Sequence, residues 1–88
     1  MPNIPPQAKV LIERSSVNSS NIKSIGHNPD ANVLEVEFYG RSVIAPGVIW
    51  RYWPITQEAY QEMLKSESIG SYFSKNIRNN NMVNQYQM

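Results

Sequence analysis

The chain has 88 residues, which is enough for about one domain and excludes a multidomain enzyme. Eight Lys and Arg against seven Asp and Glu give a formal net charge of +1, so the protein lacks the global positive field of one that gathers many phosphates. It has no Cys, so neither disulfides nor thiolate zinc sites can support so small a core. We therefore expect oligomerisation as an additional source of stability.

The N-terminal segment predicts an extended arm. Prolines stand at positions 2, 5 and 6, and no basic start is followed by an apolar stretch, so we expect no signal peptide. No apolar run approaches the roughly 18 residues of a membrane span, so we expect none. The short apolar run at residues 10–12 is compatible with an edge strand or with a buried turn of helix. We interpret residues 1–16 as a Pro-rich arm with a possible edge strand, and we expect a cytoplasmic protein.

Two segments predict the centre of a sheet. Residues 33–40 alternate between apolar and charged or polar side chains, and residues 48–53 are rich in aromatic and β-branched residues before a proline. The two segments predict a hairpin. Its apolar positions should face the core, whereas Glu35 and Glu37 should lie on the other, solvated face.

The pattern becomes helical after position 54. Thr56 is a predicted N-cap, and Ile55 with Tyr60 has the spacing of a hydrophobic staple, so we expect a helix over about 57–67. Apolar residues with a 3.6-residue period around 72–77 predict a second, shorter helix. The whole order predicts an α+β domain, with a small antiparallel sheet of three or four strands packed against one or two C-terminal helices.

A set of short motifs, taken in order, resembles the KTSC domain family. The motifs are Ser20-Asn21-Ile22-Lys23-Ser24-Ile25-Gly26, Leu34-x-Val36-x-Phe38, Trp50-x-Tyr52 before Pro54, Tyr60 with Leu64, and Ser68-x-Gly70-x-Tyr72-Phe73-x-x-x-Ile77-Arg78. The resemblance covers residues 17–80, and the Asn-, Gln- and Met-containing residues 81–88 are predicted to be a loose tail. It implies a domain found at the C-terminus of some lysyl-tRNA synthetases and as a stand-alone protein of bacteria and phages, with RNA binding as a suggested activity. The sequence departs from the family pattern at His27, at Trp50 and in the loop 41–47.

No residue pattern predicts catalysis or metal binding. His27 is the single histidine, and we interpret it as a turn residue rather than as a general base. The Glu residues are divided between a strand face and a helix face, and no nucleophile elbow or Gly-rich phosphate loop surrounds the serines. We therefore expect neither an enzyme nor a bound cofactor.

The aromatic segment 50–53 is one candidate binding element. Flat rings stack on bases, and an Arg fork grips phosphate or carboxylate at two points. Strand alternation sends Arg51 and Trp53 to one face and the other two aromatics to the core face. Trp53 is predicted to cover a pocket or a partner subunit. The alternative for Arg51 is a pair across the hairpin with Glu35 or Glu37.

The second candidate is a local positive patch at the C-terminal end. Lys75 and Arg78 are three residues apart and would share one helical face. Ser71 and Ser74 hydroxyls, with backbone amides at the start of the second helix, would accept a phosphate there. The alternative is an ordinary basic surface in which the cations stabilise the helix by interacting with the negative end of its dipole.

These observations favour noncatalytic binding of a small anionic nucleotide-type ligand, as in a phage-type protein that sequesters a host signalling nucleotide. Small ligands need few charges, whereas the basic residues of this chain are scattered. The alternatives are an RNA-binding accessory module that stacks bases on Trp53 or Tyr72, and a protein-interaction or assembly subunit that forms a homo-oligomer. The predicted ligand-binding residues are Arg51, Trp53, Ser71, Tyr72, Ser74, Lys75 and Arg78.

Overall fold

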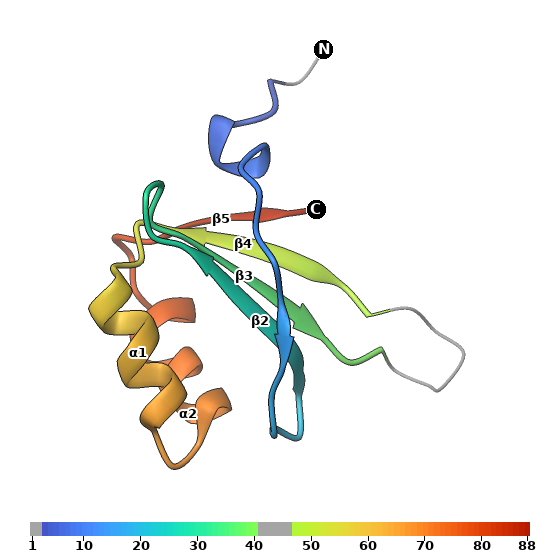
Figure 1. The fold of residues 1–88 in the computed structure, drawn as a ribbon, viewed down its shortest axis with the longest axis vertical. Helices are drawn as coiled ribbons and strands as arrows, with labels where there is room; N and C mark the ends of the chain where they lie inside the picture. Colours follow the sequence, from blue (N-terminus) through green and yellow to red (C-terminus); the bar gives the residue numbers. More distant parts are fainter. Residues whose placement is uncertain (1–2, 41–46) are drawn as a thin grey trace.

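The computed structural model describes residues 3–40 and 47–88, and it is an α+β fold in which an antiparallel sheet carries helices on one face (Figure 1). The strands follow one another across the sheet in chain order, from β1 to β5. Each strand therefore pairs with its sequence neighbour, and no crossover connection is needed. The strands are β1 (Ser15–Ser16), β2 (Ile22–Asn28), β3 (Val33–Phe38), β4 (Ile49–Trp53) and β5 (Asn84–Gln87).

The predicted central hairpin is confirmed as β3 and β4. Leu34 lies opposite Tyr52 on the core face, and Glu35 lies opposite Arg51 on the other face. The turn between β2 and β3 ends at Asn32, whose positive φ of 55° suits an asparagine better than most residues. The connection between β3 and β4, predicted to be longer than usual, includes residues 41–46, which lie outside the described residues.

Within the described residues the sheet has five strands, more than the three or four that we expect from the sequence. The polar segment at 15–24 contains β1, which pairs with β2, and the segment expected to be a loose tail contains β5, which pairs with β4. Both strands are short and mostly polar. Backbone N–H and C=O groups can pair with a neighbouring strand whatever the side chains are, so composition alone misses such edges.

Helices cover one face of the sheet, as predicted. Helix α1 (Gln57–Lys65) begins at Thr56, whose hydroxyl accepts a hydrogen bond from the Ala59 amide at 3.1 Å. Helix α2 (Ile69–Phe73) continues into the π-helical turn η2 (Ser74–Arg78). The amphipathic pattern near 72–77 therefore corresponds to two kinds of turn.

The core lies between this helical layer and the sheet. A β-bulge in β2 between Ile22 and Ser24 lets Ile22 and Ile25 both reach the core although they are three residues apart. The staple residue Ile55 is buried in the same cluster. The other buried members are Leu34, Val36, Tyr52, Met63, Phe73 and Ile77.

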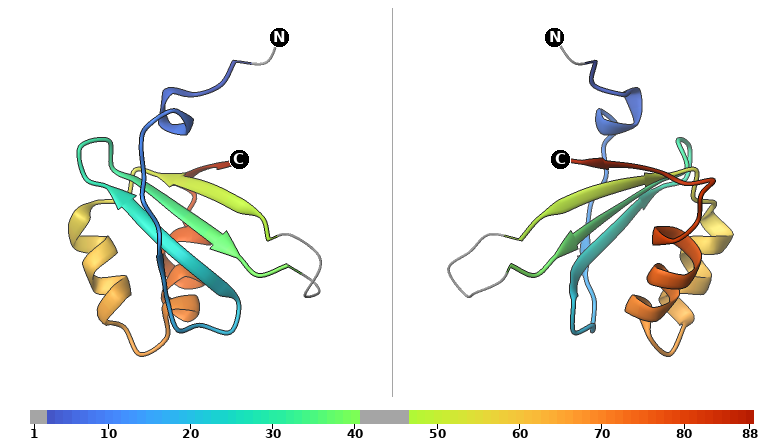
Figure 2. Two further views of the ribbon diagram at one scale, coloured as in Figure 1. Left: turned by 45° about the vertical axis from the view of Figure 1, so that its right-hand side comes forward. Right: turned by 180° about the vertical axis from the view of Figure 1, so that it is seen from behind.

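The N-terminal arm crosses the opposite, outer face of the sheet (Figure 2). The run at residues 10–12 forms neither a strand nor a helical turn, and it follows the short 3-10 turn η1 (Pro6–Ala8). Gly26 lies directly beneath the arm, where a Cβ atom would collide with the backbone of Glu13. The missing side chain at Gly26 thus allows the arm to lie close to β2.

Among residues 3–40 and 47–88, no helix has the length and apolar character needed to cross a bilayer. The same residues contain no group of three or more His, Cys, Asp or Glu side chains placed to hold a metal ion.

Candidate ligand-binding site

Three of the predicted site residues meet in a polar cleft of about 640 Å³. One wall is the loop between β1 and β2, and the other is the start of α2 with the first residues of η2. The cleft is lined by residues 18–21, residues 67–71, Ser74 and Lys75.

The loop wall of the polar cleft is held by its own hydrogen bonds. The Ser19 hydroxyl donates to Asn21 Oδ1 at 2.9 Å and accepts from the Ile22 amide at 3.3 Å. Such local side-chain contacts fix a turn without help from a ligand. The loop is therefore ordered by its own sequence.

The two walls meet at Gly70. A Cβ atom there would lie 2.7 Å from Asn21 Oδ1, so a larger residue at position 70 would require the exposed Asn21 side chain to move. On the helix side, the Ser68 hydroxyl caps α2 by accepting a hydrogen bond from the Ser71 amide at 3.2 Å. The expectation that amides at the start of this helix are open to a phosphate is thus wrong for Ser71.

The charged groups of the cleft are Lys75 and Glu67. Both are exposed, and neither forms an ion pair with any residue that the structure describes. A cleft with one cation, one carboxylate and several hydroxyl and amide groups suits a ligand that is both anionic and rich in hydroxyl donors.

The structure places Arg51 far from this chemistry. Its side chain lies on the outer face, the residue is only 6% exposed, and its Nε donates to Glu35 at 2.7 Å. Its Nη1 donates to the carbonyl oxygens of Gln7 and Val10 at 2.7 and 2.8 Å. The guanidinium therefore binds Glu35 in the sheet and two carbonyl groups of the arm, in agreement with the alternative prediction that Arg51 pairs with a Glu across the hairpin. Arg51 is thus no longer a candidate for the ligand site.

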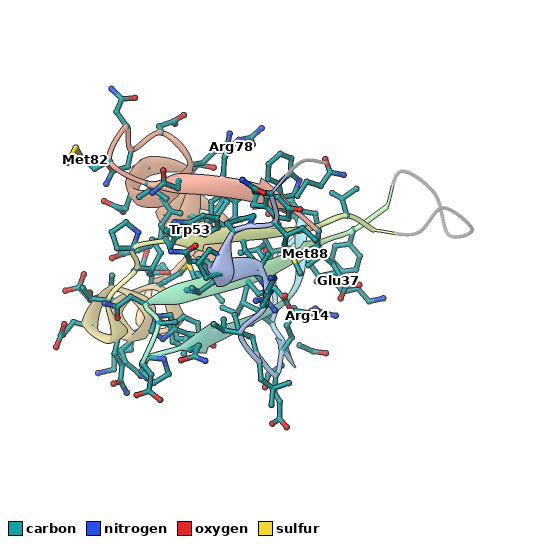
Figure 3. The ribbon with its side chains drawn as sticks, turned by 90° about the horizontal axis from the view of Figure 1, so that it is seen from above. Arg14, Glu37, Trp53, Arg78, Met82 and Met88 are labelled. Carbon is teal, nitrogen blue, oxygen red and sulfur yellow. The ribbon has the colours of Figure 1, made fainter. Side chains whose placement is uncertain are left out.

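The expectation that Glu35 and Glu37 are solvated is wrong for Glu35, which is 3% exposed. Its carboxylate contacts Arg14 as well as Arg51, and Ser24 links Arg14 to Glu37 through hydrogen bonds of 3.0 and 2.8 Å. Arg14 and Glu37 lie side by side in Figure 3. The N-terminal arm covers the outer face of the sheet and supplies Arg14 to Glu35. The alternating pattern of a strand does not reveal that another segment covers its charged face.

Trp53 and Tyr72 also lie outside the cleft lining. Trp53 is half-buried beside η1 on the outer face (Figure 3). Tyr72 donates its hydroxyl hydrogen bond to Glu62 at 3.0 Å. Partial burial, that hydrogen bond and the nearby carboxylate all raise the Tyr72 pKa. The structure therefore gives Tyr72 a helix-to-helix contact.

Arg78 lines a different hollow from Lys75. We name it the aromatic pocket; it has a volume of about 320 Å³ and is lined by Phe38, Val48, Trp50, Tyr52, Arg78 and Gln85. An α-helical spacing would put Lys75 and Arg78 on one face, but η2 is a wider π-helical turn. The prediction that both cations neutralise one phosphate is therefore wrong.

His27 lies within β2 rather than in a turn. Its Nε2 is 2.6 Å from the Ile55 carbonyl oxygen, to which it donates, and its ring stacks on Tyr60 at a centroid distance of 4.9 Å. These contacts give His27 a packing role between the sheet and α1.

Sequence reasoning missed one wall of each hollow. The loop residues 18–21 are not among the predicted ligand-binding residues, and Gln85 belongs to the segment predicted to be a loose tail. The density of Asn and Ser before Ile22 was the available signal for the loop. No local signal could place Gln85, because it reaches the pocket only through strand pairing with Tyr52.

Comparisons with known proteins agree with this fold. The KTSC domain family model matches residues 18–80. An uncharacterized protein of Stutzerimonas stutzeri (strain A1501) is 31% identical over 64 residues, which are 73% of this chain and 82% of that protein. The crystal structure of a KTSC domain protein from Yersinia pestis has a TM-score of 0.72 at 24% identity, and the match covers 89% of this chain and 99% of that one. The chain belongs to the KTSC domain family.

Proposed function

We propose that this protein binds a small anionic nucleotide-type ligand in the polar cleft without catalysing a reaction on it. One observation carries the proposal. The β1–β2 loop and the start of α2 are far apart in the sequence, yet together with Lys75 they line one cleft of about 640 Å³. Ligand sites of small molecules have volumes of roughly 300–1,000 Å³. The cleft therefore has room for a nucleotide.

Each lining group has a distinct role toward such a ligand. Lys75 neutralises a phosphate, and the Ser71 and Ser74 hydroxyls donate hydrogen bonds to its oxygens. Glu67 accepts hydrogen bonds from ribose hydroxyls. Binding without turnover is also what sequestration of a signalling nucleotide requires.

Thermal unfolding with AMP, cyclic AMP and a cyclic dinucleotide tests the proposal. A ligand of the native state at a hundredfold excess over Kd raises the Tm of a domain this size by about 15 °C. In the variant Lys75→Gln, the affinity should fall by about tenfold or more, because a charge-assisted contact is lost. The matched control is Lys65→Gln, at the exposed end of α1, which should bind as the wild type does.

Native mass spectrometry of the purified protein separates the alternatives. A retained mass of nucleotide size supports the proposal and also reports the number of subunits. A bare species, with no Tm shift for any of the three nucleotides, would contradict it. A bare oligomer would favour assembly, and steeply salt-dependent binding of RNA would favour the RNA-binding class.

A further inference from the structure

We propose that the aromatic pocket is a second, independent binding site, for a planar aromatic or heteroaromatic ring that carries one anionic group. The pocket lies on the core face of the sheet. Tyr52 and Gln85 are cross-strand partners in β4 and β5, and Arg78 approaches from η2. Its volume of about 320 Å³ is at the lower end of the range of ligand sites and is suited to a single ring with a small substituent.

The pocket presents aromatic surface that the helices leave partly uncovered. Tyr52 is buried, whereas Trp50 and Phe38 remain half-buried although they pack against the same core. The rings of Trp50 and Tyr52 are nearly parallel, with an angle of 21° and centroids 6.5 Å apart. That separation leaves no room for a third ring between them, so a ligand ring would rest on their exposed surface.

Arg78 supplies the charge. It is exposed, and no Asp or Glu in the described part of the chain forms an ion pair with it. Its positive charge acts on Tyr52 and opposes the rise in the Tyr52 pKa that burial causes. A guanidinium beside an aromatic wall binds a planar carboxylate or a phosphate through two parallel hydrogen bonds.

Gln85 adds the polar group that would orient a heterocycle. Its side chain is exposed at the pocket rim, and an amide offers both a donor and an acceptor. The aromatic rings, the guanidinium and the amide together favour a small anionic ring compound over a long nucleic acid, since Arg78 is the one cation among the described residues that line the pocket.

Three small probes separate the ring from the charge. Nicotinate has both features, nicotinamide has the same ring without the charge, and acetate has the charge without the ring. The reporter is the indole N–H signal of Trp50 in a spectrum of ¹⁵N-labelled protein. The chain has only two tryptophans, so the variant Trp53→Phe assigns the Trp50 signal.

In the wild type, nicotinate should shift the Trp50 signal saturably and leave the Trp53 signal in place. Nicotinamide and acetate should each bind about tenfold more weakly, because each lacks one of the two contacts. In Arg78→Gln, nicotinate and nicotinamide should bind equally. Lys75→Gln should retain the preference for nicotinate, because Lys75 lines the other hollow.

Two results would overturn the proposal. One is a Trp50 signal that millimolar nicotinate leaves unshifted, and the other is equal affinity of the wild type for nicotinate and nicotinamide. Failure of nucleotide binding in the polar cleft has no bearing on either result, because the Lys75 variant distinguishes the two sites.

Discussion

Glu35 holds two arginines on the outer face of the sheet. Its buried carboxylate receives Arg51 from β4 and Arg14 from the arm. A buried ion pair contributes little compared with an apolar pair of equal volume, but removal of one partner leaves a buried charge without compensation. The residue is therefore a sensitive point for stability.

We expect Glu35→Gln to lower the free energy of unfolding by about 3 kcal/mol, because Arg51 keeps its charge and loses its counterion. Urea denaturation followed by circular dichroism measures the change. Glu13→Gln is the matched control, since Glu13 lies exposed on the N-terminal arm beside Arg14 and should change stability by less than about 0.5 kcal/mol. Equal effects of the two substitutions would show that the arm is not held by Glu35.

Tyr52 gives a second prediction at this scale. Burial raises its pKa from 10.0 to about 12, with a smaller opposing effect from Arg78. The folded state therefore holds the phenol proton more tightly than the unfolded state does. The resulting stabilisation is fully present below pH 10 and is lost as the pH rises toward about 12.

Denaturation curves at several values between pH 9 and pH 12 check this dependence. In Tyr52→Phe there is no phenol to ionise, so the decrease in the free energy of unfolding above pH 10 should be smaller than in the wild type by the part that Tyr52 contributes. If the wild type and this variant lost stability in parallel above pH 10, the phenol proton would not contribute to the fold.

At the scale of elements, β5 covers the outer edge of β4. Four residue pairs join the two strands, and the Met88 amide also donates to the Ile49 carbonyl at 2.8 Å. Strand β4 is aromatic and β-branched, which is the kind of strand that pairs with other chains when its edge is open. The short polar strand β5 thus prevents the edge of the apolar strand β4 from pairing with another chain.

We expect truncation after Asn81 to destabilise the domain and to promote self-association, because the edge of β4 becomes free. Light scattering and urea denaturation measure the two effects. The control is removal of Met88 alone, which deletes the one hydrogen bond to Ile49 and leaves the four paired residues of β5 in place. A truncated protein that stays as stable and as dispersed as the full chain would contradict this role of β5.

The predicted helix start and the predicted hairpin are confirmed at this scale because each depends on short-range chemistry. The Thr56 cap bonds to an amide three residues away, and the β3–β4 register pairs Glu35 with Arg51. The π-helical turn η2 was not predictable in the same way. Ile77 is buried there, at a spacing from Phe73 that an α-helix would also allow, so a 3.6-residue pattern cannot indicate the wider turn.

At the scale of the whole molecule, the distribution of charge distinguishes binding of a small nucleotide from binding of RNA. The formal net charge is +1, and Lys75 and Arg78 line different hollows. A surface that contacts six or more phosphates loses about 10³-fold or more in affinity between 50 and 200 mM salt. A mononucleotide has no condensed counterion layer to release.

We therefore expect the affinity of the polar cleft for AMP to fall by less than about tenfold over that salt range. Calorimetric titrations at the two salt concentrations measure the ratio. A single-stranded RNA of mixed sequence serves as the comparison ligand. A steep loss for both ligands would favour an extended phosphate-binding surface over the cleft.

The sequence by itself determined the fold class, the central hairpin, the helix cap and the family, because each depends on neighbours in the chain or on motifs in fixed order. It also grouped Ser71, Ser74 and Lys75, which line one cleft, but it added Arg78, which lines another hollow. Only the tertiary structure decided which residues from distant segments lie on the same surface. The arm buries Glu35 with Arg51, Gly70 admits Asn21, and β5 brings Gln85 beside Tyr52. Each of these contacts joins segments far apart in the sequence, so no local pattern encodes it.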